Sequence, residues 1–520
     1  MYKLVIPTAG LGSRIGPYTK FKNKALVSIG DKPAISRVID LFPNAKEIII
    51  LLGYEGSAIK DVLQLLYPNR KFQFIFVDPF EGDGSGLGVT LKFAEKSLRC
   101  PFIFCPNDTL VKDINEMNPN KIGNWLSYYE KSDGDSFKSE DYRTISLRKN
   151  FVTHIHPKGS GTSNLYTGLC GIKDYKEFWS AMSDVSADSA GEIVGLSALD
   201  DVLGIKVESW FDCGNMTSLL RTKKEYAPSS YNILEKEDEA IWFKDDLVIK
   251  FSKSKDFISD RIERSMYLPK EALPKIIGVR TYAYAYQKSS GDILSENLSV
   301  DVVNDLLDWM KKRVWSVRGN PISEEILASF YNKKSFDRAK LYHSRYEFLD
   351  REIVINDKKC PKLCDLLNKI NWSQIYQKAI PVNFHGDFHP ENILVDSGKF
   401  ILLDWRQNFG EGNKEFGDLY YDLAKFMHGL LVSHPMVARN QFSVKWISEH
   451  KVKIDIQSST SLEEAKKAYY KWLDENEFDI PHVELLTAII FINIAALHEQ
   501  PYGEFLYLLA VLLMTKHVIL

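Results

Sequence analysis

The sequence of 520 residues has little of several features that mark particular classes of protein. It contains six cysteines, which form no Cys-x-x-Cys pair and no disulfide-framework spacing, so a reducing cytoplasm fits best. The formal net charge of −3 gives no basic footprint for nucleic acid. No apolar run reaches the roughly 18 residues that suggest a membrane span. The first residues have the pattern of a strand and a turn, and we expect no signal peptide.

What the chain does contain is enough for two or three ordinary domains. Hydrophobic residues make up 45% of it, which suffices for well-packed cores. No internal repeat or low-complexity tract is visible. Near the start, short apolar runs alternate with segments of helical spacing, which is typical of an α/β fold. Strands are predicted at 4–7, 47–52, 72–77 and 102–105, and helices at 34–41 and 57–66.

The C-terminal part is predicted to be richer in helix. Residues 295–380 have mostly helical spacing, and residues 485–497 and 505–514 are expected to form buried helices. Cys360 and Cys364 are expected to share a helix face. No histidine accompanies them, so they are expected to be packing residues and not a metal pair.

The first predicted strand runs directly into a glycine-rich turn. Ala9, Gly10, Gly12 and Ser13 lie where backbone N–H groups can face phosphate oxygens. Arg14 adds a permanent, fork-shaped positive charge. The turn therefore has the composition of a phosphate-binding loop.

The residues that follow extend this pattern. Lys24 comes next, then the run Gly-Asp-Lys-Pro at 30–33. The whole stretch resembles the nucleotidyltransferases that make nucleotide sugars, with their G-x-G-S/T-R … P-K … G-K-P pattern. Asn23 stands where that family usually has proline, which shifts the loop alignment by about a residue. Lys24 matches the family's catalytic lysine, and Arg14 would act with it on the leaving pyrophosphate.

The resemblance covers about residues 1–225 and implies a Rossmann-like nucleotidyltransferase fold. Gly84, Ser85 and Gly86 lie in a loop with four glycines, which this family places over the base and ribose of the nucleotide. The alternative for this loop is a mobile surface segment.

Two carboxylates match the family's metal-binding positions. Asp108 follows the predicted strand at 102–105, where an α/β fold places its ligands. Asp212 lies in the run Trp-Phe-Asp-Cys-Gly at 210–214, which resembles the family's W-x-D-x-G element. The resemblance implies that Asp108 and Asp212 hold Mg²⁺ on the α-phosphate.

The acceptor side of this half is marked by single residues. Lys158 resembles the lysine that precedes the sugar site of the family. Tyr166, Gly168 and Glu192 resemble its acceptor-binding strand and turn. The alternative for Lys158 is an ordinary solvated lysine.

A second constellation lies at residues 383–406. His385-Gly386-Asp387 precedes Asn392, and Asp404 follows a short apolar run. Two predicted strands joined by a turn at 396–398 would bring Asn392 and Asp404 together. Transfer of a phosphoryl group from Mg-ATP needs these groups, because one Asp accepts the hydroxyl proton while an Asn and another Asp hold Mg²⁺.

This arrangement resembles the aminoglycoside phosphotransferase and choline kinase family, with its H-G-D-x-x-x-x-N and D-W motifs. Residues 417–424 also match the family's GD-x-x-x-DLA segment. Many members carry an acidic residue where this sequence has Arg406. The resemblance covers about residues 232–520 and implies a two-lobed, protein-kinase-like α+β fold.

The small lobe of such a fold holds the nucleotide. Two strands are predicted in residues 239–251, where Lys250 has the pattern of a kinase lysine that contacts ATP phosphates. A helix predicted at 259–268 would let Glu263 pair with Lys250. Residues 284–294 resemble the segment that holds adenine.

Together the resemblances predict a nucleotidyltransferase domain at 1–226 and a kinase-like phosphotransferase domain at 227–520, joined by a linker at 226–230. They imply a bifunctional enzyme that uses ATP, a second nucleoside triphosphate and Mg²⁺. It would phosphorylate a small alcohol and join the phosphate to a nucleotide, giving an activated precursor for surface polysaccharide or lipid. CTP is favoured because choline kinase and phosphocholine cytidylyltransferase are a known pairing. The alcohol is choline, a sugar or a polyol.

A different hypothesis is also retained. The chain would then be a nucleotidyltransferase of single activity, and its kinase-like part would be a regulatory or substrate-binding module. An oligomer is compatible with either hypothesis.

Overall fold

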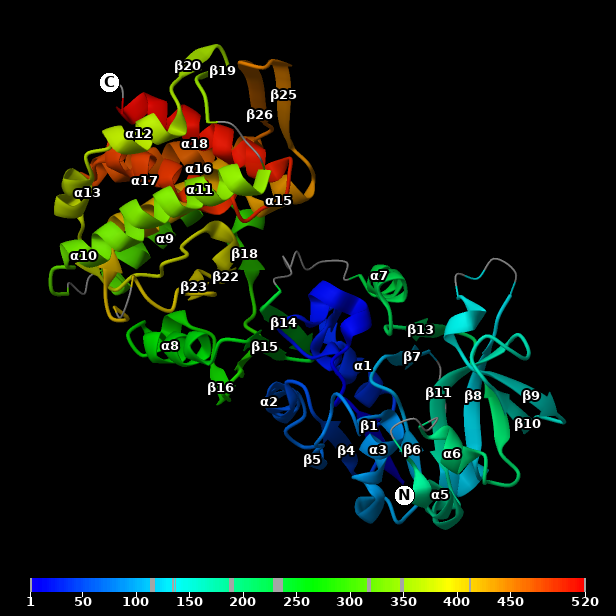
Figure 1. Ribbon diagram of the computed structural model, residues 1–520. Coiled ribbons are helices and arrows are strands. Elements are labelled where there is room, and N and C mark those ends of the chain that lie inside the picture. Colours follow the sequence, from blue (N-terminus) through cyan, green and yellow to red (C-terminus); the bar gives the residue numbers. More distant parts are fainter. Residues whose placement is uncertain are drawn as a thin grey trace. The chain divides into compact units, whose positions relative to one another are not determined.

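The computed structural model describes residues 2–112, 117–132, 135, 137–186, 191–227, 237–315, 319–346, 350–410 and 413–518. The chain divides into two compact units, one of Met1–Lys255 with Ile276–Gln287 and the other of Asp256–Lys275 with Lys288–Leu520 (Figure 1). Residues 228–230 of the expected linker lie outside the described residues. The division into functional domains at residues 226 and 227 stays a prediction.

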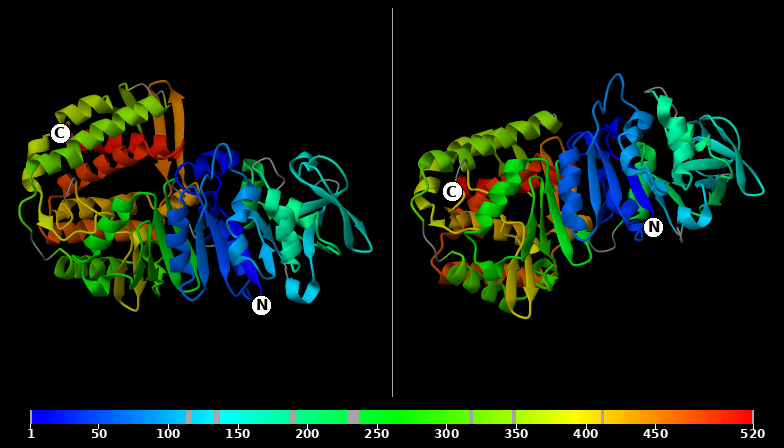
Figure 2. Two further views of the ribbon diagram at one scale, coloured as in Figure 1. Left: turned by 60° about the horizontal axis from the view of Figure 1, so that its bottom comes forward. Right: turned by 90° about the horizontal axis from the view of Figure 1, so that it is seen from below.

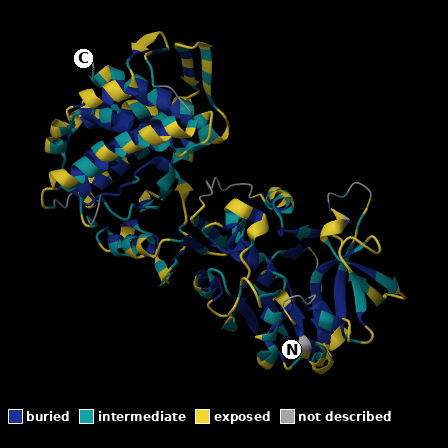
Figure 3. Cartoon of the chain, viewed as in Figure 1, coloured by how far each residue is buried: buried dark blue, intermediate teal, exposed yellow. Residues whose placement is uncertain are grey.

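The first unit is built around a nine-stranded mixed sheet. Across the sheet the strands are β5 (Phe72–Phe76), β4 (Ile48–Leu52), β1 (Lys3–Pro7), β6 (Phe102–Phe104), β11 (Asn164–Ile172), β8 (Trp125–Glu130), β12 (Leu203–Lys206), β10 (Phe151–His156) and β9 (Thr144–Arg148). The four strands β5, β4, β1 and β6 are parallel. All five residues of β4 are buried, as expected for a parallel strand covered on both faces (Figure 3). The predicted strands and the α/β fold class are confirmed for this unit.

Short helices and two small pairs of strands complete this unit. The helices are α1 (Ala34–Asp40), α2 (Gly56–Leu66), α3 (Leu87–Lys92), α4 (Pro119–Ile122), α5 (Tyr175–Ala181), α6 (Ile193–Leu196) and α7 (Met216–Glu225). The small strand pairs are β2 (Ser28–Ile29) with β3 (Lys32–Pro33), and β7 (Thr109–Val111) with β13 (Trp210–Asp212). The helices predicted at 34–41 and 57–66 are confirmed by α1 and α2.

A second sheet also belongs to the first unit. Its order is β14 (Glu239–Lys244), β15 (Leu247–Ser252), β17 (Ala283–Gln287) and β16 (Ile276–Val279). Trp242 is fully buried in the core shared with the nine-stranded sheet, and its Nε1 donates to Ser28 Oγ at 3.0 Å. The N–H of Tyr282 donates to Asp61 Oδ2 on α2 at 3.1 Å. The strands that resemble a kinase small lobe therefore pack onto the N-terminal sheet.

The second unit is mainly helical. Its helices are α8 (Lys255–Ser265), α9 (Val300–Arg313), α10 (Glu324–Leu327), α11 (Lys334–Tyr346), α12 (Leu363–Lys369), α13 (Trp372–Lys378), α14 (Leu419–Leu431), α15 (His434–Ala438), α16 (Thr460–Glu475), α17 (Ile480–Ala495) and α18 (Tyr502–Val518). The long helices α17 and α18 lie side by side, and α14 packs on α17 (Figure 2). Buried helices were predicted at 485–497 and 505–514, and α17 and α18 confirm them. No helix of the described ranges is long and apolar enough to span a membrane.

Short strands frame the helices of this unit. They are β18 (Asp292–Ile293) with β22 (Ile393–Asp396) and β23 (Lys399–Leu402), the pair β21 (Pro381–Val382) and β24 (Gly417–Asp418), and the sheet β20 (Lys358–Cys360), β19 (Ile353–Ile355), β26 (Lys451–Ile456) and β25 (Phe442–Ser448). The hairpin predicted around residues 396–398 is confirmed by β22 and β23.

Two local expectations for the second unit are wrong. Cys360 is buried on β20, whereas Cys364 is exposed on α12, so they share no helix face. Residues 358–360 pair as a strand because Asn356 and Asp357 adopt positive φ and close a tight turn. The helix predicted at 259–268 begins earlier, at Lys255, and ends at Ser265.

Candidate active sites

The glycine-rich turn of the first unit lies against the segment that carries Lys24. After β1 the chain passes through Gly12, whose φ of 69° is the left-handed region. A Cβ at Gly12 would lie 3.0 Å from the Thr19 methyl group and 3.1 Å from the Lys24 Cβ. Both the backbone conformation and the close approach therefore favour glycine at this position.

The other residues of this turn differ in exposure. Ala9 is buried, and its carbonyl oxygen accepts the N–H of Tyr54 at 2.9 Å. A Cβ at Gly10 would meet no atom within 4 Å, so the surface there is open. Ser13 and Arg14 are exposed. The turn therefore exposes its backbone at Gly10 and the guanidinium group of Arg14 to solvent.

Asn23, where the sequence departs from the family pattern, has a structural role of its own. Its side-chain amide donates to the Thr8 carbonyl oxygen at 2.9 Å and to the Tyr54 carbonyl oxygen at 2.7 Å. Its Oδ1 accepts the N–H of Ala25 at 2.9 Å. The first two bonds tie the turn before Lys24 to the ends of two neighbouring strands, and the third holds the turn itself.

The structure brings Asp108 and Asp212 together. Strand β7 pairs with β13 so that Thr109 lies opposite Asp212, which places the preceding Asp108 beside it. A Cβ at Gly214 would lie 2.8 Å from Asp212 Oδ1 and 3.3 Å from Asp108 Oδ2. The two carboxylates therefore flank one small space, which glycine leaves open.

These two carboxyl groups are in different electrostatic states. Lys24 Nζ forms an ion pair with Asp108, and Tyr142 donates its hydroxyl proton to Asp212 Oδ2 at 2.7 Å. Burial raises the pKa of Asp108, but the charges of Lys24 and Arg14 outweigh it and the net pKa is lowered. Burial and the negative charge of Asp108 both raise the pKa of Asp212. A cation between the two carboxylates would relieve their repulsion.

Of the residues expected on the acceptor side, only some lie close together in the structure. Gly168 has a φ of 88°, and a Cβ there would lie 2.8 Å from the Pro106 ring, two residues before Asp108. Tyr166 and Glu192 are buried close together, and burial raises the pKa of Glu192 to about 7. Lys158 is exposed on the turn after β10.

The loop expected over the nucleotide is held by its own backbone. Gly84 has a φ of 84°, and Ser85 donates its hydroxyl to the Gly82 carbonyl oxygen at 2.7 Å. Gly86 lies just before α3, and Gly84 is exposed. Residues 81–84 of this loop are exposed to solvent.

In the second unit, a buried carboxylate positions the loop that carries Asp387. Asp422 on α14 accepts the backbone N–H groups of His385 and Gly386, both at 2.7 Å, and the indole N–H of Trp315 at 2.9 Å. Burial raises the pKa of Asp422 to about 6. The sequence motif at 417–424 contains Asp422, but only the structure gives it this positioning role.

Asp387 has three polar neighbours. Lys425 Nζ lies 2.6 Å from its Oδ1, and the Asn392 amide donates to its Oδ2 at 3.1 Å. His389 Nε2 is 3.9 Å from the same Oδ2. Burial raises the pKa of Asp387, but Lys425 and His389 outweigh it and hold the net pKa well below its usual value. Asp387 is therefore ionised at neutral pH and can accept a hydrogen bond from a hydroxyl group.

The hairpin also brings Asn392 and the Asp404 segment together, because the Leu403 N–H donates to the Asn392 carbonyl oxygen at 2.7 Å. Asp404 has a φ of 58°, which is rare for a residue other than glycine. Its Oδ1 pairs with Arg261 Nη1 at 2.5 Å, and the Trp405 indole donates to the Arg261 carbonyl oxygen at 2.8 Å. Sequence reasoning missed Arg261 because 143 residues separate it from Asp404.

The expected nucleotide residues Lys250 and Glu263 lie in different compact units, and their pairing stays a prediction. Lys250 is buried on β15 between Ile241 and Tyr284 of the neighbouring strands. Glu263 on α8 accepts Lys414 Nζ at 2.8 Å.

At either site a metal ion would need ligands in addition to the protein side chains, such as phosphate oxygens of the substrate. Among the residues that the structure describes, no group of three or more His, Cys, Asp or Glu side chains could hold a metal ion. The pair Asp108 and Asp212 and the pair Asn392 and Asp404 supply hard oxygen atoms, which suit Mg²⁺ shared with phosphate oxygens.

Comparisons with known proteins give structural neighbours only. No family model matches the sequence, and no curated protein matches it. A putative glucose-1-phosphate thymidylyltransferase from Bacillus anthracis aligns at 19% identity over 46% of this chain and 98% of its own, with a TM-score of 0.38. CTP:phosphocholine cytidylyltransferase from Streptococcus pneumoniae aligns at 18% identity over 43% and 98%, with a TM-score of 0.36. The inositol-1-phosphate CTP transferase from T. maritima aligns at 14% identity over 44% and 98%, with a TM-score of 0.35. These nucleotidyltransferases align with the N-terminal part of the chain.

Proposed function

We propose that the chain is a bifunctional transferase. The second unit phosphorylates a small alcohol with ATP, and the first unit joins that phosphate to a nucleoside monophosphate and releases pyrophosphate. The observation that carries the proposal is that each unit holds an ionised Asp in contact with a Lys, Asp108 with Lys24 and Asp387 with Lys425. CTP is the favoured second nucleotide because of the sequence resemblance set out above.

In the first unit the acceptor phosphate attacks the α-phosphorus of the nucleotide. Lys24, Arg14 and the backbone amides of the turn at 9–13 would stabilise negative charge on the leaving pyrophosphate. Asp108 and Asp212 would hold Mg²⁺, which supplies positive charge to the phosphate oxygens.

In the second unit Asp387 would orient the alcohol and take its proton as the phosphoryl group is transferred. Asp422 supports this step because it fixes the backbone of the loop before Asp387. Asn392 and Asp404 would hold Mg²⁺ on the ATP phosphates.

One observation favours the hypothesis of a single activity. Arg261 already occupies Asp404 Oδ1, as it would in a module that has no metal to bind. In a working kinase this ion pair must open when Mg-ATP binds, so the two hypotheses differ in whether ATP is consumed.

The test is to incubate the full chain with Mg²⁺, ATP, CTP and a panel of alcohols, and to follow phosphorus by ³¹P NMR. A bifunctional enzyme gives ADP, pyrophosphate and a new diphosphate diester. A nucleotidyltransferase of single activity gives the diester and pyrophosphate only when the phosphorylated alcohol is supplied, and it forms no ADP.

A further inference from the structure

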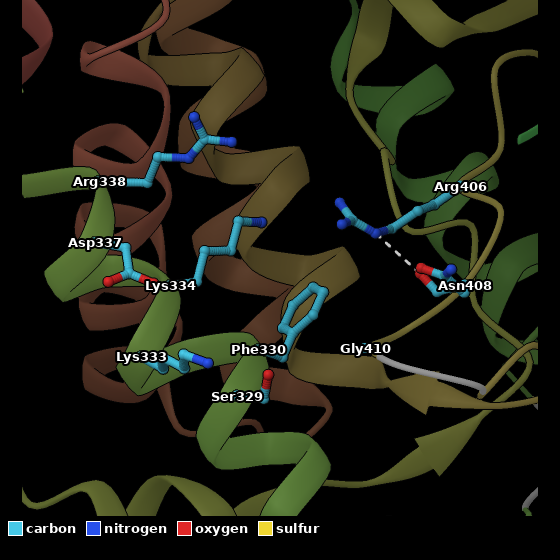
Figure 4. Close-up of a pocket in the computed structure, with 9 residues that line it drawn as sticks. All are labelled: Ser329, Phe330, Lys333, Lys334, Asp337, Arg338, Arg406, Asn408 and Gly410. Carbon is cyan, nitrogen blue, oxygen red and sulfur yellow. Dashed lines mark hydrogen bonds between the residues drawn. The ribbon is translucent and has the colours of Figure 1, made fainter. Parts of the chain in front are cut away.

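The second unit contains a pocket of about 480 Å³ whose lining is strongly cationic (Figure 4). It lies between the segment that starts α11 and the segment that follows Asp404. Its charged and aromatic lining residues are Phe330, Lys333, Lys334, Asp337, Arg338 and Arg406. Among them, four side chains are cations and one is a carboxylate.

The positive charge of this pocket is not neutralised within the described part of the chain. None of the four cations forms an ion pair with a described residue, and Arg406 Nε donates only to the Asn408 carbonyl oxygen at 2.9 Å. In Figure 4 the amino group of Lys334 and the guanidinium group of Arg406 extend toward each other across the hollow. Such an arrangement of like charges indicates a site for a negatively charged group.

An aromatic ring joins two of these cations. Lys334 Nζ lies 4.9 Å from the centre of the Phe330 ring, and the Arg406 guanidinium carbon lies 5.0 Å from it. The ring itself stacks on Phe409 at 4.0 Å. Because both cations already use this ring, a quaternary ammonium group such as that of choline would meet repulsion here and not an aromatic cage.

The pocket lies next to the loop that carries Asp387, and Arg406 contacts both. The Arg406 N–H donates to the His385 carbonyl oxygen at 2.8 Å. A Cβ at Gly386 would lie 2.4 Å from the Arg406 Cβ, so the stem of Arg406 packs directly on the residue before Asp387. The pocket therefore shares Arg406 with the wall of the loop that carries Asp387, and the negative charge of Asp387 acts on Lys334 in the pocket lining.

The electrostatics of Lys334 agree with this geometry. Burial, together with the charges of Arg406, Arg338 and Lys425, lowers the pKa of Lys334 to about 7, while the charge of Asp387 opposes this shift. A bound anion would favour the charged form of this lysine.

We infer that the alcohol phosphorylated at Asp387 is an anion, carrying a carboxylate or a phosphate that binds Lys334, Arg338 and Arg406. This inference rests on the proposed kinase activity and narrows its substrate class. It also gives a role to Arg406, the position at which the sequence departs from its family resemblance. A cationic alcohol such as choline is thereby disfavoured.

The test uses the full chain with Mg-ATP and two matched series of alcohols. One series is glycerol, glycerate and glycerol 3-phosphate, and the other is glucitol, gluconate and glucitol 6-phosphate, with choline as the cationic arm. ADP formation is measured for each. We expect kcat/KM for a carboxylate or a phosphate member to exceed that of the neutral member and of choline by at least about ten-fold. The two anionic arms distinguish a carboxylate substrate from a phosphate substrate.

Variants locate the effect in the pocket. Lys334→Gln and Arg406→Gln should each raise the KM for the anionic alcohol about 10- to 100-fold, since each removes a charged hydrogen bond, and should leave the KM for ATP unchanged. Lys334→Arg keeps the charge and should retain most of the affinity. Lys340→Gln, exposed on the same helix but outside the lining, is the matched control and should have no effect.

The outcomes separate this inference from the proposed function. Equal use of neutral or cationic alcohols, with unchanged KM in both pocket variants, would overturn the anionic substrate while the kinase activity stands. If no alcohol yields ADP, the proposed kinase activity is wrong. Calorimetry with the same anionic alcohols then tests whether the pocket binds an anion. Binding that is weakened in Lys334→Gln supports the anion pocket on its own, and no binding to the wild-type chain overturns it.

Discussion

The two candidate sites hold an Asp–Lys pair in different surroundings. In the first unit Lys24 binds Asp108 beside a second carboxylate, and the negative charge of Asp108 helps to raise the pKa of Asp212. In the second unit Lys425 binds Asp387, and further cations line the pocket next to it. The first site thus holds two neighbouring carboxylates whose repulsion a metal ion can relieve, whereas the second has an excess of positive charge that an anionic substrate can neutralise.

The two lysines of these ion pairs are also expected to behave differently during the reaction. In the proposed reaction Lys24 would face the nucleotide phosphates, so it would leave Asp108 to bind a phosphate oxygen. Lys425 is buried on α14 and is fixed beside Asp387. We therefore expect the first ion pair to open during the reaction and the second to persist.

The largest effects should come from removing the two paired carboxylates. Asp387→Asn should reduce ADP formation by about 10²- to 10⁴-fold, because the amide cannot take the hydroxyl proton. Asp108→Asn should abolish pyrophosphate release, because it removes the carboxylate that would hold the metal. Each variant should retain the other activity, measured with externally supplied phosphorylated alcohol for Asp387→Asn. Loss of both activities in either variant would mean that the sites do not act separately.

A core substitution tests how far each unit extends along the sequence. Trp242 lies in the stretch that resembles a kinase, yet its ring is buried in the core of the first unit. Trp242→Ala should destabilise that unit by about 3 to 5 kcal/mol. Thermal inactivation should therefore affect pyrophosphate release at a lower temperature than in the wild-type chain.

The matched control is Trp446→Ala, which removes a half-exposed indole from the second unit. It should leave the thermal inactivation of pyrophosphate release unchanged.

A fragment of residues 1–290 should also be more soluble than one of residues 1–226, because the longer fragment keeps the sheet that covers α2. Equal solubility of the two fragments would show that the shared core contributes little.

A smaller effect is expected where a carboxylate only positions the catalytic loop. Asp422→Asn keeps the shape of the side chain but removes the charge and one acceptor from a buried group that receives three N–H donors. The variant should lose about 1 to 3 kcal/mol of stability. It should also lower kcat for ADP formation more than it raises the KM for ATP. Asp365→Asn, exposed on α12, is the control and should behave like the wild-type chain.

Local sequence patterns predicted the parts of these sites that depend on neighbouring residues. The strand before Asp108 and the hairpin after Asn392 were predicted because apolar runs and turn residues specify them locally. The pairing of β7 with β13, which places Asp212 beside Asp108, spans a hundred residues and was expected only from the family resemblance.

Other features were not predictable because they depend on long-range contacts. Lys425, Arg261 and Lys334 belong to helices whose sequence spacing shows only which face is apolar. Their approach to Asp387, Asp404 and the pocket is set by how those helices pack. For the same reason we did not predict that Trp242 packs in the core of the N-terminal sheet, because the sequence does not show which residues a buried Trp contacts.

A pH-dependent effect on stability is expected for Glu192, which the sequence resemblance assigns to the acceptor side of the first unit. Burial raises the pKa of Glu192 to about 7 in the folded chain, whereas an exposed Glu in the unfolded chain titrates near about 4.3. Between these values the folded chain holds a proton that the unfolded chain has released. The free energy of unfolding should therefore fall as pH rises from about 4.3 to 7, and this contribution should be constant outside that window.

Glu192→Gln removes this titration and keeps the size of the side chain. The stability of the variant relative to the wild-type chain should rise between pH 5 and pH 7 and then level off, as measured by urea unfolding across that range. Asp418 and Asp422, whose pKa values burial raises to about 6, titrate in both proteins, so their contributions cancel in the difference. A difference that is independent of pH would show that Glu192 is ionised throughout.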